Sequence, residues 1–180
     1  DADSFEMNGA QLKLKDTVSA NYETKASYAV IVTATDNGTG GLTTSQAFTV
    51  TVNDVNEAPT AIALSATAIN ENAAGAVVGT LTTTDEDAGD THTYTLTGDD
   101  AEFFEVVSSS GQLKLKDTVS ANYENKNSYA VTVTATDSGT GGLTTSQNYT
   151  VEVNVAPTEI SLDDYSVEEN YIGSPVGVIS

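Results

Sequence analysis

Hydrophobic and polar side chains alternate over short runs along most of this chain. In residues 128–136, Tyr129, Val131, Val133 and Ala135 occupy every second position, and the positions between them are mostly threonine. Successive side chains of a β-strand point to opposite faces, so this period of two predicts a strand and not a helix. The predicted strands are residues 60–64 with 67–69, 77–83, 91–96, 103–107, 112–116, 128–136 and 143–153.

Segments rich in Gly, Asp, Asn and Ser separate these runs, as in residues 85–90 and 137–142. Such residues favour turns, because glycine adopts backbone conformations that other residues resist and Asp or Asn side chains bond to the nearby backbone. Seven short strands without an amphipathic helix predict an all-β fold, a seven-stranded Greek-key β-sandwich of the immunoglobulin-like type.

The chain repeats itself. Residues 11–53 recur as residues 112–154, shifted by 101, with differences at only seven positions. Residues 58–60 and 71–72 recur as 156–158 and 169–170, shifted by 98. The repeating unit is therefore about one hundred residues long, and tandem repeats of this kind contact mainly their neighbours. We expect residues 1–55 to be the C-terminal part of one repeat, 56–155 a complete repeat, and 156–180 the N-terminal part of the next.

The charge composition limits the classes of partner that the chain can bind. The net charge is −20, from 26 acidic and 6 basic residues, and all six bases are lysine. Nucleic acid and anionic membrane surfaces are therefore poor partners, whereas cations are favourable ones. Cysteine is absent, and no apolar run approaches the roughly 20 residues of a membrane helix.

Several carboxylates are predicted to meet at one end of the complete repeat. Antiparallel strands place the loops 85–90 and 137–142 at the same end, beside the incoming linker 54–59, and Glu23 of the preceding repeat faces the same junction. Unpaired carboxylates about 4 Å apart repel each other by roughly 1 to 4 kcal/mol. A Ca²⁺ ion, which takes six to eight oxygen ligands, turns this net repulsion into attraction when it lies between them. The residues expected there are Glu23, Asp54, Asn56, Glu57, Asp85, Asp87 and Asp137.

The chain contains five short motifs. They are Ile69-Asn70-Glu71-Asn72, Asp85-Glu86-Asp87, Asn122-Tyr123-Glu124, Ala135-Thr136-Asp137 and Asp54-Val55-Asn56-Glu57-Ala58-Pro59. With them the chain resembles the cadherin family, in the bacterial cadherin-like tandem-repeat form of large secreted adhesins of the repeats-in-toxin type.

The resemblance implies that the junction residues named above are Ca²⁺ ligands, and that Glu71 and Glu124 face a second junction. The second linker, residues 154–157, lacks the segment with Asp and Glu. We therefore expect a weaker or absent calcium site there.

The functional hypothesis is a non-catalytic, calcium-rigidified extender of an extracellular adhesin or matrix fibre, secreted or at the cell surface, of the kind found in biofilms. The alternative is a module that binds carbohydrate or makes homophilic contacts. Neighbouring repeats are the expected partners, with surface glycans and self-association into filaments as further classes. End-to-end copies could also complete a sandwich from residues 1–55 and 156–180. The single histidine, His92, cannot build a histidine-based metal site, and Tyr22 and Tyr123 are expected in the core.

Overall fold

The computed structural model describes residues 1–155, 161, 166, 169, 172–173 and 178. Their contacts divide the chain into two compact units. The first comprises Asp1–Ile62, Thr83–Thr93 and Ala135–Thr145, and the second comprises Ala63–Thr82, Tyr94–Thr134 and the described residues of Ser146–Ser180.

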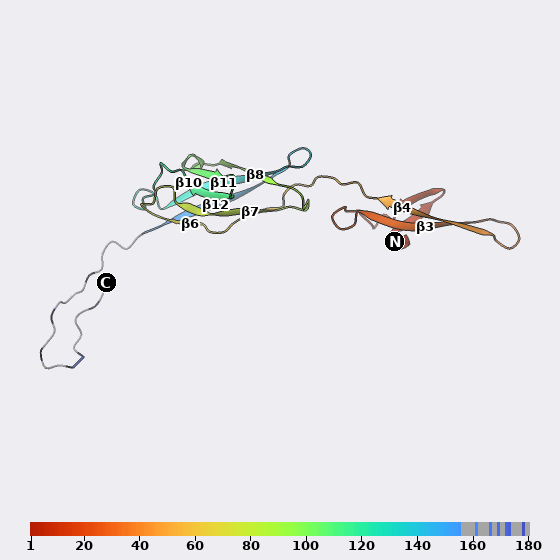
Figure 1. The fold of residues 1–180 in the computed structure, drawn as a ribbon, viewed down its shortest axis with the longest axis horizontal. Helices are drawn as coiled ribbons and strands as arrows, with labels where there is room; N and C mark the ends of the chain where they lie inside the picture. The colour runs from red at the N-terminus through yellow and green to blue at the C-terminus, as the bar shows by residue number, and fades with distance from the viewer. Residues whose placement is uncertain (156–160, 162–165, 167–168, 170–171, 174–177, 179–180) are drawn as a thin grey trace. The chain divides into compact units, whose positions relative to one another are not determined.

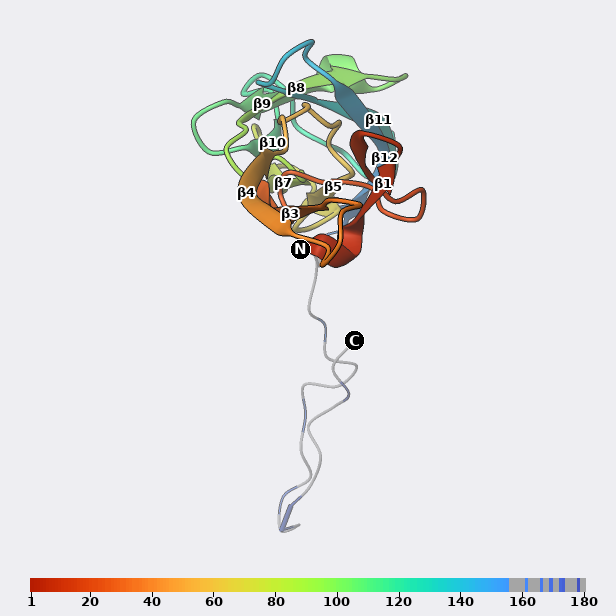
Figure 2. The ribbon, with the colours of Figure 1, turned by 90° about the vertical axis from the view of Figure 1, so that its right-hand side faces the viewer.

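Two four-stranded sheets form a β-sandwich, which confirms the predicted all-β fold (Figures 1 and 2). In one sheet the order is β5 (Ala61–Leu64), β7 (Val77–Thr84), β10 (Gln112–Leu115) and β9 (Phe104–Val107). In the other it is β6 (Ala68–Asn70), β12 (Thr144–Asn154), β11 (Ser128–Asp137) and β8 (His92–Thr97). A 3₁₀ turn, η2 (Ala101–Phe103), precedes β9.

The first predicted strand is divided between the two sheets. β5 pairs with β7, whereas β6 pairs in parallel with β12, with Val153 opposite Ile69. The chain crosses between the sheets at Ser65 and Ala66, close to Gly79 of β7. A Cβ atom on Gly79 would lie 2.8 Å from the backbone nitrogen of Ala66, so glycine is required at this crossing.

The core of the sandwich consists of the alternating side chains that the sequence indicated. Leu113 and Leu115 of β10, and Val133 and Ala135 of β11, are 0% exposed. Other buried apolar side chains of the two sheets are Ile62, Ile69, Val78, Leu81, Phe104, Tyr129, Val131, Val151 and Val153. Lys114 lies between the two buried leucines and is half-buried, as expected for the outer face of the strand.

Residues 1–55 form two smaller sheets. After a 3₁₀ turn, η1 (Ala2–Ser4), strand β1 (Phe5–Asn8) pairs with β2 (Gln11–Leu14), and β3 (Ser27–Thr35) pairs with β4 (Thr43–Thr51). Phe5, Tyr28 and Val30 form a buried cluster, and Leu12 and Leu14 pack against it. The rings of Phe5 and Tyr28 meet edge to face, with centroids 5.5 Å apart.

The repeated sequence supplies a matched test of this core. Leu113→Ala should lower the free energy of unfolding by about 2–5 kcal/mol, because the truncated side chain leaves a cavity in a closed core. Leu12 has the same neighbours in sequence but is only half-buried, so Leu12→Ala should change the main unfolding transition by less than about 1 kcal/mol. Urea denaturation measures both, and equal losses would contradict the packing described.

Candidate metal centre

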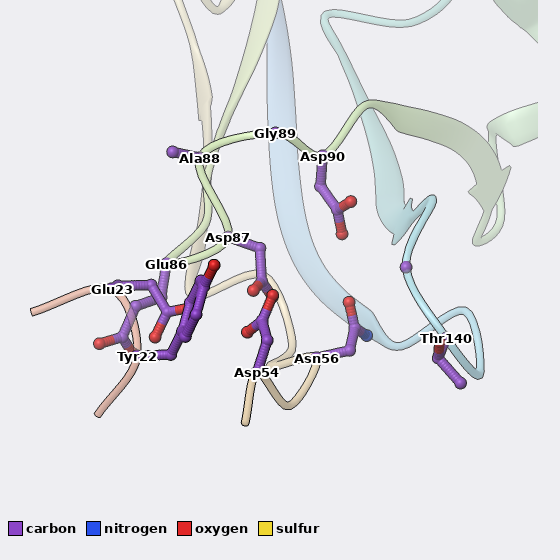
Figure 3. Close-up of a pocket in the computed structure, with 11 residues that line it drawn as sticks. Tyr22, Glu23, Asp54, Asn56, Glu86, Asp87, Ala88, Gly89, Asp90 and Thr140 are labelled. Atoms are coloured by element: carbon purple, nitrogen blue, oxygen red, sulfur yellow. The ribbon is translucent and has the colours of Figure 1, made fainter. Parts of the chain in front are cut away.

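Four segments that are far apart in sequence meet within the first unit. They are the turn at 21–24, the linker at 54–57, the loop after β7 and the loop after β11. Together they line a cavity of about 720 Å³, shown in Figure 3. The lining residues include Tyr22, Glu23, Asp54, Asn56, Glu86, Asp87 and Asp90.

Glu23, Asp54 and Asp87 form the first group of carboxylates. One oxygen of each lies within 4.8 Å of the others. In Figure 3 the carboxylates of Asp54 and Asp87 point toward each other. The backbone N–H of Glu57 donates a 2.9 Å hydrogen bond to Asp87 Oδ2, which fixes the linker against the loop after β7.

Asp85, Asp90 and Asp137 form the second group, again with oxygens within 4.8 Å of one another. Asp137 is 6% exposed, and its Oδ1 accepts hydrogen bonds of 3.1 Å from the backbone N–H groups of Gly139 and Leu143. Its Oδ2 accepts a 3.1 Å hydrogen bond from Asn56 Nδ2. The linker is thus joined to the loop after β11 through Asn56.

Burial and the crowding of negative charge raise the pKa values of two glutamates, Glu23 and Glu57. Burial is the main factor that raises the pKa of Glu57, and the charges of Glu23 and Asp87 raise it further. For Glu23 a backbone hydrogen bond lowers the pKa, but burial and the neighbouring Asp54 and Asp87 outweigh it, so the pKa is raised. These sites therefore resist ionisation when no cation is bound.

Asp85 behaves differently because it has a partner. Burial acts to raise its pKa, but the hydrogen bond with His92 and one from the backbone N–H of Asp87 outweigh burial and lower it. His92 Nε2 lies 2.8 Å from Asp85 Oδ2, and the Asp85 side chain is only 4% exposed. Asp85 is thus held in place and favours its charged form.

In the described part of the chain, two buried carboxylate oxygens have no hydrogen-bond partner, Glu57 Oε2 and Asp90 Oδ2. Gly139 leaves room beside the second of them, because a Cβ atom there would lie 2.8 Å from Asp90 Oδ2 and 1.6 Å from Asn56 Oδ1. Buried oxygens without partners are costly unless a cation or water satisfies them. An all-oxygen donor set with this charge fits a hard divalent cation such as Ca²⁺.

The structure places the seven residues expected at the first junction around this cavity or in contact with its carboxylates. Glu71 and Glu124 are elsewhere. Glu71 is 8% exposed and accepts a 3.3 Å hydrogen bond from the backbone N–H of Tyr123, whereas Glu124 is exposed. Neither belongs to a group of three close carboxylates among the described residues. Much of the segment expected to face them, residues 156–180, lies outside the described residues.

Two residues, Asp90 and His92, have roles at the site that were not expected from the sequence. Two others, Tyr22 and Tyr123, were wrongly expected in the core. Asp90 contributes a side-chain oxygen to the second group, and His92 positions Asp85. The acidic loop 85–90 was a signal for Asp90, whereas no sequence pattern indicated the contact between His92 and Asp85. Tyr22 and Tyr123 are 41% and 40% exposed and not in the core, because each lies in a turn between strands.

Comparison with models of protein families matches residues 65–155 to the cadherin domain. Comparison with curated protein sequences finds no significant match. The described part of the chain contains no helix with the length and hydrophobicity that a membrane span requires.

Solved cadherin structures share the fold. The chain is 25% identical to a cis-dimer structure of protocadherin gammaB7 EC3-6, with a TM-score of 0.63, and the match covers 94% of this chain and 42% of that one. It is also 25% identical to mouse cadherin-23 EC22-24, with a TM-score of 0.64, over 85% of this chain and 50% of that one.

Human mucin-like protocadherin EC1-2 matches at 23% identity and a TM-score of 0.55, over 85% of this chain and 79% of that one. The chain spans half or less of the length of the first two of these structures. Because the family match covers more than half of the residues, the chain belongs to the cadherin domain family.

Proposed function

We propose that the two groups of carboxylates bind Ca²⁺ and that the chain is a calcium-rigidified, non-catalytic extender of an extracellular adhesin or matrix fibre. The supporting observation is that six carboxylates from four segments lie in two close groups, with buried oxygens that lack a partner. Bacterial origin, secretion to the cell surface and a place in tandem repeats belong to the same proposal.

The side chains divide naturally between two ions. Glu23, Asp54 and Asp87, with Glu57 beside them, would hold one, and Asp85, Asp90 and Asp137, with Asn56, would hold another. Ca²⁺ accepts six to eight oxygens in flexible geometry, so carboxylates, an amide and backbone carbonyls suit it better than Mg²⁺, which demands a strict octahedron. When bound, the ion supplies charge neutralisation and a link between segments.

Neutralisation would have a mechanical consequence. Glu23 belongs to the turn before β3, Asp54 to the linker, and Asp87 to the loop after β7. Without a cation their mutual repulsion favours separation of these segments. With Ca²⁺ between them the segments are held together, so the linker stiffens. Extracellular calcium modules typically have dissociation constants of about 10⁻⁴–10⁻³ M, suited to calcium-rich surroundings.

A weaker or absent site at the second junction remains part of the proposal, since the linker 154–157 has no Asp or Glu. The alternative function, carbohydrate or homophilic binding, also stays a prediction. Carbohydrate binding requires an exposed aromatic surface, and a glycan array tests it directly.

Calcium should stabilise the protein through these carboxylates. We expect 10 mM Ca²⁺ to raise the melting temperature over that in chelator by about 5–15 °C, since binding at 10–100 times the dissociation constant adds about 1.4–2.7 kcal/mol per site. Asp137→Asn should remove at least half of this increase. Small-angle scattering should show a smaller and more variable maximum dimension in chelator.

Asp36→Asn is the matched control. Asp36 is the counterpart of Asp137 in the repeat, and its Oδ1 accepts the same two hydrogen bonds, from Gly38 at 3.1 Å and Leu42 at 3.0 Å. It is exposed and belongs to neither carboxylate group. Asp36→Asn should leave the calcium-induced increase intact. Equal effects of the two substitutions, or no calcium effect in the unmodified chain, would contradict the proposal.

The raised pKa values predict a pH dependence that calcium reverses. A group whose pKa is higher in the folded state stabilises it below its ordinary pKa, here 4.5, and this contribution is lost as pH rises through the folded value. In chelator, raising the pH above 4.5 should therefore weaken the junction, whereas in Ca²⁺ it should strengthen it because ionised ligands bind the cation.

Carbon-13 NMR of the carboxyl groups measures this titration. In chelator Glu23 and Glu57 should titrate above 4.5, and calcium should lower both values. In chelator, the stability of the double variant Glu23→Gln with Glu57→Gln should depend less on pH than that of the unmodified chain, because these two carboxylates no longer titrate. Titration of Glu57 at or below 4.5 in chelator would show that the charges are not crowded.

A further inference from the structure

The carboxylate of Asp90 is held by Ser138, a residue of the loop after β11. Ser138 Oγ donates a 3.1 Å hydrogen bond to Asp90 Oδ1 and accepts a 3.1 Å hydrogen bond from the backbone N–H of Thr91. A hydroxyl group has one proton to donate, so these two bonds together fix its direction. The loop after β11 is thereby joined to the residues immediately before β8.

The bond to Ser138 determines which oxygen of Asp90 is left for a ligand. Oδ1 accepts the bond from Ser138, whereas Oδ2 is buried and has no hydrogen-bond partner in the described part of the chain. Asp90 also offers an oxygen within 4.8 Å of oxygens of Asp85 and Asp137. In Figure 3 the Asp90 side chain is directed from its loop toward Asn56 of the linker. Ser138 therefore holds Asp90 in the orientation that places it in the second group of carboxylates.

Asp85, in the same group, is oriented by the first residue of β8. His92 Nε2 lies 2.8 Å from Asp85 Oδ2, and the backbone N–H of Asp87 donates a 3.3 Å hydrogen bond to Asp85 Oδ1. An ionised carboxylate only accepts hydrogen bonds, so the ring nitrogen carries the proton in this pair. The side chains of His92 and Asp85 are only 13% and 4% exposed. The neighbouring residues Thr91 and His92 thus orient two carboxylates, one through Ser138 and one directly.

The second group is more enclosed than the first. Asp137 is buried, and Asp85 and Asp90 are half-buried. In the first group, Glu23 and Asp54 are exposed. Ligands that are already held in place lose less conformational freedom on binding than ligands that an ion has to assemble. The hydrogen bonds that orient the second group therefore favour binding of a cation there.

We propose that Ser138 and His92 are positioning residues, which hold Asp90 and Asp85 in place for a divalent cation and are not themselves ligands. The inference rests on the calcium binding proposed above for the second group. Each of the two residues donates to one oxygen of its carboxylate, and the remaining lone pairs of that carboxylate are left for the ion. Hydrogen-bond partners that orient metal ligands in this way typically contribute about 10–100-fold to metal affinity.

The sequence repeat supplies a matched control for Ser138. Its counterpart, shifted by 101, is Asn37, and the two residues stand in otherwise identical loops between an aspartate and a glycine. Asn37 is exposed, and the preceding Asp36 belongs to neither group of carboxylates. Asn37→Ala therefore makes a comparable change in the same kind of loop, away from the proposed cation.

An NMR titration of the full chain with Ca²⁺ tests the role of both residues. The amide signals of Gly139 and Leu143 report on the second group, because their N–H groups bond to Asp137. Ser138→Ala should raise the dissociation constant at least about tenfold. Ser138→Thr, which keeps a hydroxyl group, and the control Asn37→Ala should each change it by less than about twofold.

His92 is tested by the same titration. His92→Phe keeps a ring but removes the N–H donor, so it should raise the dissociation constant at least about tenfold. His92→Gln keeps an N–H donor and should recover most of the affinity. Ser138 is exposed, so its variants leave the core intact and decide the question if His92→Phe does not fold.

Thermal unfolding in chelator separates positioning from a purely structural role. Ser138→Ala should unfold cooperatively in chelator, within about 8 °C of the unmodified chain, because it removes two hydrogen bonds at the surface. If Ser138→Ala binds calcium as tightly as the unmodified chain, or Ser138→Thr loses as much affinity as Ser138→Ala, the positioning role is overturned and the calcium site stands. If calcium moves neither amide signal in the unmodified chain, the calcium site is overturned and the positioning role with it.

Discussion

Repulsion between carboxylates that the fold brings close together is the interaction on which this structure depends. Asp137 is fixed by two backbone N–H groups and by Asn56, and Asp85 is fixed by His92. The strands β7 and β11 bring their loops together, so the sandwich positions the acidic side chains of these two loops. Acidic residues that serve only solubility are usually distributed over the protein surface. The concentration of these charges, with two buried oxygens left without partners, is what the proposed divalent cation would neutralise.

The sandwich was largely predictable because its pattern is local. Alternating side chains in β10, β11 and β12 are buried in the expected phase. The two segments 60–64 and 67–69 were predicted, but their assignment to different sheets was not, since it depends on the close approach of Gly79 to Ala66, a contact between distant residues. The burial of Asp100 likewise depends on residues distant in sequence, because its carboxylate accepts hydrogen bonds from Lys126 and from the backbone N–H of Ala130.

The site was predictable to the level of its loops. Strand direction alone brought Asp85, Asp87 and Asp137 to the linker, since antiparallel order fixes which loops share an end. Strand order alone does not show which individual side chains are in contact. Asp90 lies three residues after Asp87, and only the path of its loop shows that its side chain meets Asp137. The comparison of Asp36 with Asp137 shows the same limit, because the aspartate of a nearly identical loop is exposed in one repeat and buried among carboxylates in the other.

The most direct test is an anomalous-difference map from crystals grown in millimolar calcium. We expect one peak enclosed by Glu23, Asp54 and Asp87, and another enclosed by Asp85, Asp90 and Asp137. Well-ordered density showing only water at both positions, in crystals soaked with excess calcium, would contradict the proposed calcium sites.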